Sequence, residues 1–451
     1  MPTNRENRVF FISLGCAKNQ VDSEHMLGLL ESRRFEFVTT INEAEIVVIN
    51  TCSFIQAAVE ETIDTILAIA ELKKQGKLAK LVVAGCFVQR YGYKLRKEMP
   101  EVDGWLGTGE IYRIAEVIMN DNPNGPAPFL LSRPTYLADH TVPRVQTTPF
   151  YSAFLRIAEG CSHRCSYCII PGLRGPLRSR GLESLIIETE EMVGRGVKEI
   201  NLVAQDTTMY GRDLEGEIRL EDLVEKLLAI KGIQWIRLLY CHPDRISDRL
   251  LELINSEEAI CPYLDLPHQH VNEKILKAMG RDSASQTPLE VIERIRAVKR
   301  KISLRTTLMV GFPGETDEIF QELFDFVKAV RFDHLGVFVF SPEQGTAAAR
   351  LKPIVEREVA EQRRSEIMGL QSDISKALNH RMVGHIFPVL IEGPSAETDL
   401  LLKGRTAAMA PDVDAQVLIN KGDGMIGEIM PVLISEAHSY DIVGEIVKNI
   451  F

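Results

Sequence analysis

The first third of the chain alternates short apolar runs with longer amphipathic stretches. The runs are continuous, rich in β-branched residues and too short for independent helices, so they predict buried strands. The stretches between them carry apolar residues at helical spacing. The predicted strands are 10–15, 45–51 and 80–85; the predicted helices are 57–74, with Ile63, Ile66, Leu67 and Ala70 on its apolar face, and an earlier one capped by Asp22 or Ser23 that runs to Arg33. This pattern favours a parallel α/β domain over residues 1–140.

A second strand–helix series begins after a Pro-rich, non-periodic stretch that predicts a domain boundary near residues 140–150. Six strand-like runs favour a (βα)6 partial barrel of the TIM type over the complete barrel of eight units. The strands are 153–158, 199–204, 233–240, 263–267, 304–310 and 335–340, and helical stretches include 220–230, 288–300 and 317–330. We predict this core domain over residues 147–378, with its chemistry at the carboxyl ends of the strands.

The last part of the chain changes character after a charged, helical connector at 356–380. The runs FPVLIEG, DLLLKGRT, AQVLI and MPVLISEAHSYDIVGEIV are short, apolar and separated by turn residues. This pattern is typical of a small antiparallel β-barrel. We predict that barrel over residues 380–448.

Composition narrows the class of protein. The 451 residues are 45% hydrophobic and 25% charged, and no apolar run approaches the roughly 20 residues that a membrane-spanning helix needs. The first residues lack the apolar core of a signal peptide, so we expect a cytoplasmic protein with no membrane partner. The net charge of −11 argues against a protein that binds nucleic acid over its whole surface.

Three of the eight cysteines each follow a predicted strand of the first domain. Cys16, Cys52 and Cys86 stand in SLGC, INTC and VAGC. In a parallel sheet all three would meet at one edge, where ligand sites of open α/β sheets form. Each alone is more simply explained as a buried structural thiol. Three thiolates that converge at one edge would make a metal or iron–sulfur site.

A second cysteine set opens the predicted barrel. In CSHRCSYC, the thiols of Cys161, Cys165 and Cys168 can point inward from one tight loop and hold three corners of a cubane cluster. The fourth iron would then be free to bind a substrate or cofactor. Zinc is the alternative, with His163 or a distant residue completing a tetrahedral site, although structural zinc sites usually pair two short hooks that this chain lacks.

The CxxxCxxC loop, with Tyr167 before its last cysteine, resembles the signature of radical S-adenosylmethionine (SAM) enzymes. Together, IAEGCSHRCSYCIIPGLRGPLRSR, SLGCAKNQVDSE, INTCSFI, VAGC and VGFPGET resemble the methylthiotransferase family. The resemblance covers essentially the whole chain, in the order auxiliary-cluster domain, radical SAM core and TRAM-like β-barrel. It implies that Cys161, Cys165 and Cys168 hold the [4Fe–4S] cluster that binds and cleaves SAM, and that Cys16, Cys52 and Cys86 hold a second [4Fe–4S] cluster.

Other polar residues at the predicted active face are weaker candidates, because a loop or capping role would explain each of them equally well. Tyr167 is a candidate for packing against adenine, with a core role as the alternative. The candidates for binding SAM or substrate are Tyr167, Gln205, Asp206, His242, Gln269, His270, Gly311, Gly314 and Glu315. We expect Cys241 and Cys261 to be unligated, and the role of His268 is open.

The residues within these motifs resemble two branches of the family to different degrees. They are more similar to the branch that modifies an aspartate of small-subunit ribosomal protein twelve than to the branch that modifies an adenosine in tRNA. That resemblance implies a methylthio group inserted at the aspartate β-carbon, with one SAM as methyl source, another as radical source, and separate sulfur and electron donors. Residues 380–451 carry five basic and ten acidic residues, which suits a basic protein partner better than RNA, although an ordinary solvated acidic surface has the same balance. The alternatives are tRNA methylthiolation and a non-catalytic iron–sulfur or zinc protein that binds RNA or ribosomes.

Overall fold

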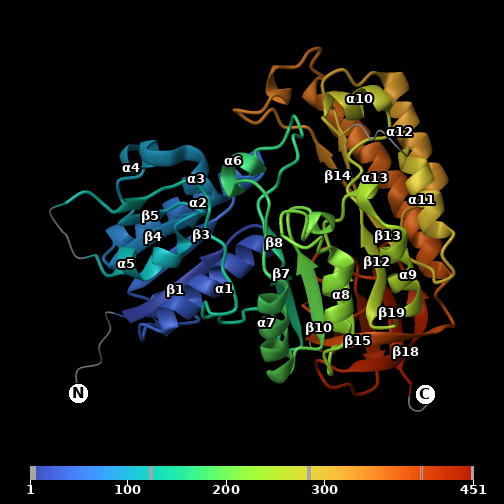
Figure 1. The fold of residues 1–451 in the computed structure, drawn as a ribbon, viewed down its shortest axis with the longest axis horizontal. Coiled ribbons are helices and arrows are strands. Elements are labelled where there is room, and N and C mark those ends of the chain that lie inside the picture. The colour runs from blue at the N-terminus through green and yellow to red at the C-terminus, as the bar shows by residue number, and fades with distance from the viewer. Residues whose placement is uncertain (1–6, 121–124, 282–285, 397, 399, 448–451) are drawn as a thin grey trace.

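The computed structural model describes residues 7–120, 125–281, 286–396, 398 and 400–447. Two parallel six-stranded sheets lie side by side, and a closed five-stranded barrel packs beneath the second (Figure 1). Among the described residues, no helix combines the length and the apolar character that crossing a membrane would require. The arrangement confirms the predicted fold class.

The first sheet has the strand order β2-β1-β3-β4-β5-β6, with every pair parallel. Its central strands are the three predicted from continuous apolar runs, and β3 and most of β4 are fully buried because helices cover both faces. The elements are β1 (Arg8–Ser13), β2 (Glu36–Phe37), β3 (Ile46–Thr51), β4 (Lys80–Gly85), β5 (Gly104–Leu106), β6 (Phe129–Leu130), α1 (Ala17–Glu31), α2 (Gln56–Lys74), α3 (Cys86–Tyr91), α4 (Leu95–Glu98) and α5 (Ile114–Ile118).

Two details of the predicted helices were wrong. Helix α1 begins at Ala17 with Cys16 as its N-cap, well before the predicted caps Asp22 and Ser23. Those two side chains are buried and bind groups elsewhere: the Asp22 carboxylate pairs with arginines of the second domain, and the Ser23 hydroxyl donates to the carbonyl of Asn19. In α2, Leu67 is half exposed and does not join the apolar face.

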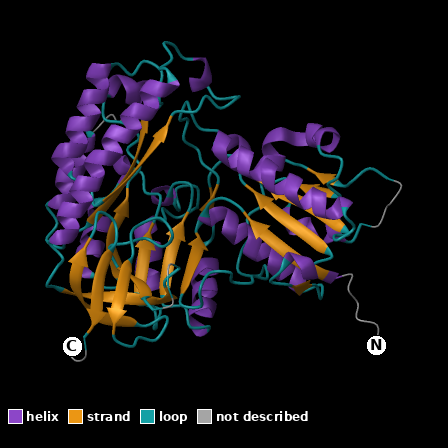
Figure 2. Ribbon diagram, turned by 180° about the vertical axis from the view of Figure 1, so that it is seen from behind, coloured by secondary structure: helices purple, strands orange, loops and turns teal. Residues whose placement is uncertain are grey.

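The second sheet has the order β14-β13-β12-β11-β10-β7, again all parallel, and its six strands are those expected of a (βα)6 partial barrel. Alternate residues serve two layers: Leu155, Leu202 and Leu264 pack under the outer helices, whereas Phe154, Val203 and Tyr263 face inward. Helices flank the strands on one side (Figure 2). The elements are β7 (Ser152–Arg156), β10 (Glu199–Val203), β11 (Trp235–Leu238), β12 (Ile260–Asp265), β13 (Ser303–Val310), β14 (His334–Val339), α6 (Ile170–Arg174), α7 (Leu182–Gly194), α8 (Leu220–Leu228), α9 (Asp248–Ser256), α10 (Glu273–Ala278), α11 (Pro288–Arg296), α12 (Asp317–Val330) and α13 (Arg357–His380), with a short ribbon of β8 (Ala158–Glu159) and β9 (Arg178–Ser179).

The C-terminal barrel closes in the order β15-β16-β17-β19-β18. Four pairings are antiparallel as predicted, but β17 and β19 pair in parallel. The strands are β15 (Ile386–Pro394), β16 (Leu402–Thr406), β17 (Val417–Lys421), β18 (Ile429–Ala437) and β19 (Ile442–Ile446). This barrel lies where the core strands begin, away from their carboxyl ends (Figure 1).

A buried ionic cluster joins the C-terminal barrel to the core. Glu199, the first residue of β10, is 1% exposed and pairs with Arg405 of β16 and with Arg237 of β11. Burial raises the pKa of the Glu199 carboxyl, but the two guanidinium groups outweigh it and lower the pKa to about 2. Because both arginines are also buried, neither has water as an alternative partner.

Replacing Glu199 with Ala is expected to destabilise the chain by about 3–5 kcal/mol, because two buried cations would lose their common partner. Urea unfolding followed by tryptophan fluorescence measures this, since Trp235 lies next to Arg237 and Arg405. Glu428→Ala is the matched control; it removes only the more exposed ion pair with Lys198 and should cost about 1 kcal/mol or less. The difference between wild type and E199A should persist above about pH 4.3 and shrink as pH falls toward 2. Equal losses for E199A and E428A would contradict the expectation.

Candidate active site between the two cysteine sets

The three cysteines that follow the N-terminal strands lie together at the carboxyl edge of that sheet. Cys16 caps α1, Cys52 follows β3, and Cys86 opens α3. Gly15 has φ +99°, and a Cβ there would lie 2.8 Å from the Cβ of Cys52, so the turn that leads to Cys16 passes directly over Cys52. Besides burial, electrostatic repulsion from Cys16 and Cys52 contributes to the raised pKa of the Cys86 thiol, so both lie close to it. The structure thus brings the three thiols to one place.

The loop that holds Cys161, Cys165 and Cys168 is fixed by its backbone. The amide of Cys161 donates to the carbonyl of Gly175 at 3.0 Å, and the amide of Cys168 donates to that of Cys165 at 3.1 Å. Gly160 has φ +77°, and a Cβ there would lie 2.1 Å from the Pro176 carbonyl oxygen. The loop therefore returns closely on itself, and each thiol lies near enough to affect another.

His163, the candidate fourth zinc ligand, is engaged elsewhere. Its Nε2 lies 2.6 Å from Oδ2 of Asp206, and its ring stacks on His242 at 4.8 Å between centroids. Throughout the described ranges, no three His, Cys, Asp or Glu side chains are already spaced to hold a single metal ion. His163 thus contributes to a polar layer beside the loop.

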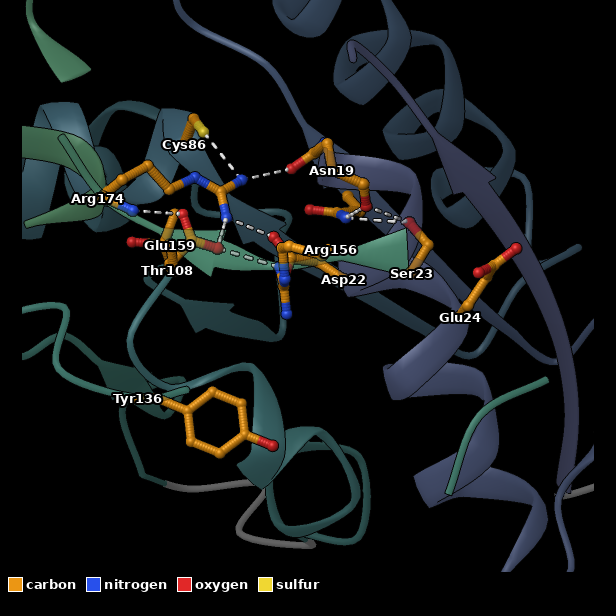
Figure 3. A network of polar contacts seen from close by, with 12 residues as sticks. Asn19, Asp22, Ser23, Glu24, Cys86, Thr108, Tyr136, Arg156, Glu159 and Arg174 are labelled. Carbon is orange, nitrogen blue, oxygen red and sulfur yellow. Dashed lines mark hydrogen bonds and ion pairs between the residues drawn. The ribbon is translucent and has the colours of Figure 1, made fainter. Parts of the chain in front are cut away.

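Three contacts cross the interface between the domains next to the two cysteine sets. Lys18 of α1 extends into the core, where its Nζ lies 3.3 Å from the ring centroid of Tyr240, just after β11. Arg90 of α3 pairs with Glu343, beyond β14, at 2.6 Å. Arg174, at the end of α6, reaches the Cys86 sulfur at 3.4 Å (Figure 3). Segments that carry both sets are thus held together by buried contacts.

Comparison with known families divides the chain into the same three parts. Residues 8–107 match an uncharacterized protein family, UPF0004, residues 155–327 match the radical SAM superfamily, and residues 383–447 match the TRAM domain. The radical SAM match includes all three cysteines of the second set.

Whole-chain relatives identify the family. The ribosomal protein uS12 methylthiotransferase RimO of Geotalea uraniireducens is 48% identical over 99% of this chain and 100% of the relative. The RimO of Geobacter sulfurreducens is 46% identical over 99% and 100%, and that of Myxococcus xanthus is 43% identical over 100% and 94%. The chain belongs to the RimO family. Among solved structures, the radical SAM methyltransferase TsrM of Kitasatospora setae shares the fold, with a TM-score of 0.53 at 16% identity over 74% of this chain and 72% of that one.

In this RimO-family chain, two other predicted site residues lie directly beside the cysteine loop. Gln205 donates to the Glu159 carboxylate at 2.7 Å. Burial acts to raise the pKa of the Asp206 carboxyl, but the hydrogen bonds that it accepts from His163 and from the Thr208 hydroxyl hold the pKa below its usual value. Both side chains are occupied with internal contacts that shape the mouth of the barrel.

Tyr167 lies between the loop and the core. Its ring packs against a small cluster that includes Met279 and Phe312, and the Arg281 guanidinium interacts with both Tyr167 and Cys165. Burial raises the pKa of the Tyr167 hydroxyl. The structure thus favours a packing role for the ring within the protein itself, the alternative left open by the sequence.

Three further candidates, Gln269, Gly311 and Glu315, lie farther round the barrel. Gln269 pairs with β13 through its backbone, and its side chain is partly exposed. Glu315 is buried: its Oε1 accepts from the Gly311 amide at 3.0 Å and from Arg363 of α13 at 2.7 Å. These contacts make Glu315 the residue that holds the Gly311 turn against α13.

Two cations near the cysteines, the buried Arg174 and the partly buried Arg281, were not anticipated from the sequence. Arg174 lies within the IIPGLRG motif, but its partners lie outside that motif: Asp22 belongs to the N-terminal domain and Glu159 to β8. Arg281 stands beside Cys165 although 116 positions separate them in the chain. Burial raises the pKa of the Cys86 thiol to about 12, and Arg174 opposes that rise. A cation beside a buried thiol favours its thiolate form, the form that binds metal.

Proposed function

We propose that this chain is a ribosomal protein uS12 methylthiotransferase, which inserts a methylthio group at the β-carbon of an aspartate in uS12. The observation that carries the proposal is the match to RimO proteins along the entire chain, at 43–48% identity. We propose residues 1–140 as the auxiliary-cluster domain, 147–378 as the radical SAM core and 380–448 as the TRAM domain; Lys448 lies outside the described residues. We expect the protein to be located in the cytoplasm.

The thiols present fit two [4Fe–4S] clusters. Iron–sulfur clusters are held by cysteine thiolates, and each set supplies three of them, which leaves one iron of each cubane without a protein ligand. We propose Cys161, Cys165 and Cys168 as ligands of the SAM-binding cluster, and Cys16, Cys52 and Cys86 as ligands of a second. With SAM bound and one electron from an external donor, the first of these clusters would supply a 5′-deoxyadenosyl radical, which can take hydrogen from an unactivated carbon.

The chain's own residues prepare these sites. The close turn at Gly160 holds the backbone of the second set, and Arg281 balances the charge of Cys165. Lys18, two residues after Cys16, lies over the ring of Tyr240 and so joins the auxiliary domain to the core. Tyr167, Gln205, Asp206, Gln269, Gly311 and Glu315 remain our candidates for the SAM-binding wall; the internal contacts of Asp206 and Glu315 favour positioning roles for these two.

The charge of the TRAM barrel supports a basic protein as partner. Arg405 is buried under Glu199, so this cation offers little to a phosphate backbone. Glu436 and Asp423 are exposed. Because tight RNA binding gains from free Lys and Arg, tRNA is the less favoured substrate. The reaction also requires a sulfur donor and an electron donor.

Mass spectrometry of uS12 and of digested tRNA, from cells with and without the gene, tests the proposed function. We expect the methylthio mass on the uS12 aspartate to disappear without the gene and tRNA to stay unchanged. Loss of methylthio adenosine from tRNA, with uS12 unchanged, would overturn the substrate assignment and leave the cysteine assignments standing.

Replacing Gly160 with Ala is expected to prevent the second cysteine set, Cys161, Cys165 and Cys168, from holding its cluster, because the added Cβ would meet the Pro176 carbonyl and the backbone angle is unfavourable. After anaerobic reconstitution, iron should fall from about eight to about four atoms per chain. Gly172→Ala is the matched control: a Cβ on this residue of α6 meets nothing within 4 Å, so the variant should keep its full iron content. A G160A protein with the wild-type iron content would contradict this role of the turn.

A further inference from the structure

Arg174 connects the radical SAM loop to the auxiliary cysteines. It ends α6, six residues after Cys168, and the residue is 3% exposed. Nη1 lies 2.5 Å from Oδ2 of Asp22 and 3.4 Å from Oε2 of Glu159, whereas Nη2 lies 3.0 Å from Oδ1 of Asn19 and 3.4 Å from the sulfur of Cys86. Figure 3 shows the guanidinium between these groups.

The ionic pairing of Arg174 does not require the sulfur. Arg156 bonds the same two carboxylates, Asp22 and Glu159, so two guanidinium groups already match two carboxylates. The Nη1 side of Arg174 serves this balanced cluster. Nη2 points to Asn19 and Cys86 instead. Its hydrogen bond to the Cys86 sulfur therefore lies outside the ionic cluster and is not needed to balance the charges there.

Asn19 extends the reach of Arg174 to the other two cysteines. Its Nδ2 donates to the carbonyl of Leu14, two residues before Cys16, and to that of Thr51, immediately before Cys52. Its Oδ1 accepts from Arg174. One guanidinium therefore contacts Cys86 directly and, through one amide, holds the backbone that leads to Cys16 and Cys52.

The position of Arg174 is itself fixed by both domains. Thr108 of the N-terminal domain donates to the Leu173 carbonyl at 2.6 Å. Gly175 follows at φ +75°, where a Cβ would lie 2.6 Å from the Pro134 carbonyl, and it also accepts from the Cys161 amide. The side chain thus has little freedom to leave the sulfur.

We propose that Arg174 is a positioning residue for the auxiliary iron–sulfur cluster, and that its hydrogen bond to Cys86 raises the reduction potential of that cluster. The proposal rests on the proposed function, in which Cys16, Cys52 and Cys86 are the ligands. Hydrogen bonds to cluster sulfur and nearby positive charge stabilise the reduced form, which carries one more negative charge. The same contact ties the auxiliary site to the loop of Cys168.

The test uses the full chain with Cys161, Cys165 and Cys168 all changed to Ala, so that only the auxiliary set can hold iron. Iron content and the reduction potential, followed by electron paramagnetic resonance, are measured with Arg174→Gln, Arg174→Lys and Arg156→Gln added separately. We expect R174Q to shift the potential to a more negative value. R174K should shift it less, because the charge stays while the planar fork is lost.

Arg156→Gln is the matched control, since it removes an equally buried guanidinium from the same two carboxylates, while the contact of Arg174 with Cys86 remains. Equal shifts in R156Q and R174Q, or an unchanged potential in R174Q, would overturn the proposal. If R174Q does not fold, a wild-type potential in R174K overturns it instead. If the protein with Cys161, Cys165 and Cys168 changed to Ala binds no iron, the auxiliary cluster itself is refuted. If it binds about four irons and the Arg174 variants keep its reduction potential, only this inference is refuted.

Discussion

Replacing Cys161 with Ala is expected to abolish the reductive cleavage of SAM. The substitution keeps the Cβ and the backbone, whose amide is held by the Gly175 carbonyl at 3.0 Å, so the change is confined to one sulfur. Two thiols then remain in a loop proposed to supply three. The loss should far exceed the roughly 10–100-fold that follows from changing an outer partner of a metal ligand. Chromatography of 5′-deoxyadenosine, formed under anaerobic reducing conditions, measures it.

Cys241→Ala is the control for Cys161→Ala. Cys241 is fully buried after β11 and lies outside both sets, so its loss should leave SAM cleavage near the wild-type rate, with a modest decrease in stability. Normal deoxyadenosine formation by C161A would remove the basis for assigning the radical SAM site to this loop.

The strands were predictable because their signal is local. Buried parallel strands such as β3 and β4 are continuous apolar runs, and the cysteines that follow them come to one edge by topology alone. The start of α1 was not predictable in this way. Asp22 has the composition of a cap, but its carboxylate serves Arg174, 152 positions away, and no local pattern carries that information.

The same limit applies to the site. The sequence places Glu315 after a strand of the core, which makes it a candidate for ligand binding, but its buried carboxylate is taken by Arg363 of a later helix. The parallel pairing of β17 with β19 is likewise a long-range choice between short strands of similar composition. Arg174 illustrates the converse, because a residue inside a visible motif gains its importance from partners that only the fold supplies.

Replacing Cys52 with Ala is expected to separate the two proposed sites: deoxyadenosine should still form, but uS12 should receive no methylthio group. The substitution is structurally mild. Gly15 packs closest to the Cβ of Cys52, which Ala retains, and the Cys52 carbonyl still accepts from the Thr62 hydroxyl at 2.8 Å. Only the sulfur of Cys52 is lost. Deoxyadenosine and modified uS12 peptide, measured in one reaction mixture, give both readouts.

Cys261→Ala is the control for Cys52→Ala, since Cys261 is a buried thiol of β12 among the inward-facing core residues and should support both products. Continued methylthiolation by C52A would exclude Cys52 as an essential ligand. Loss of both products in C52A, with C261A active, would mean that the sites cannot be separated chemically. Arg174 supplies a structural route for such coupling, because it bonds Cys86 on one side and continues from the Cys168 loop on the other. The ratio of the two products therefore measures how far the auxiliary site acts independently of the radical SAM site.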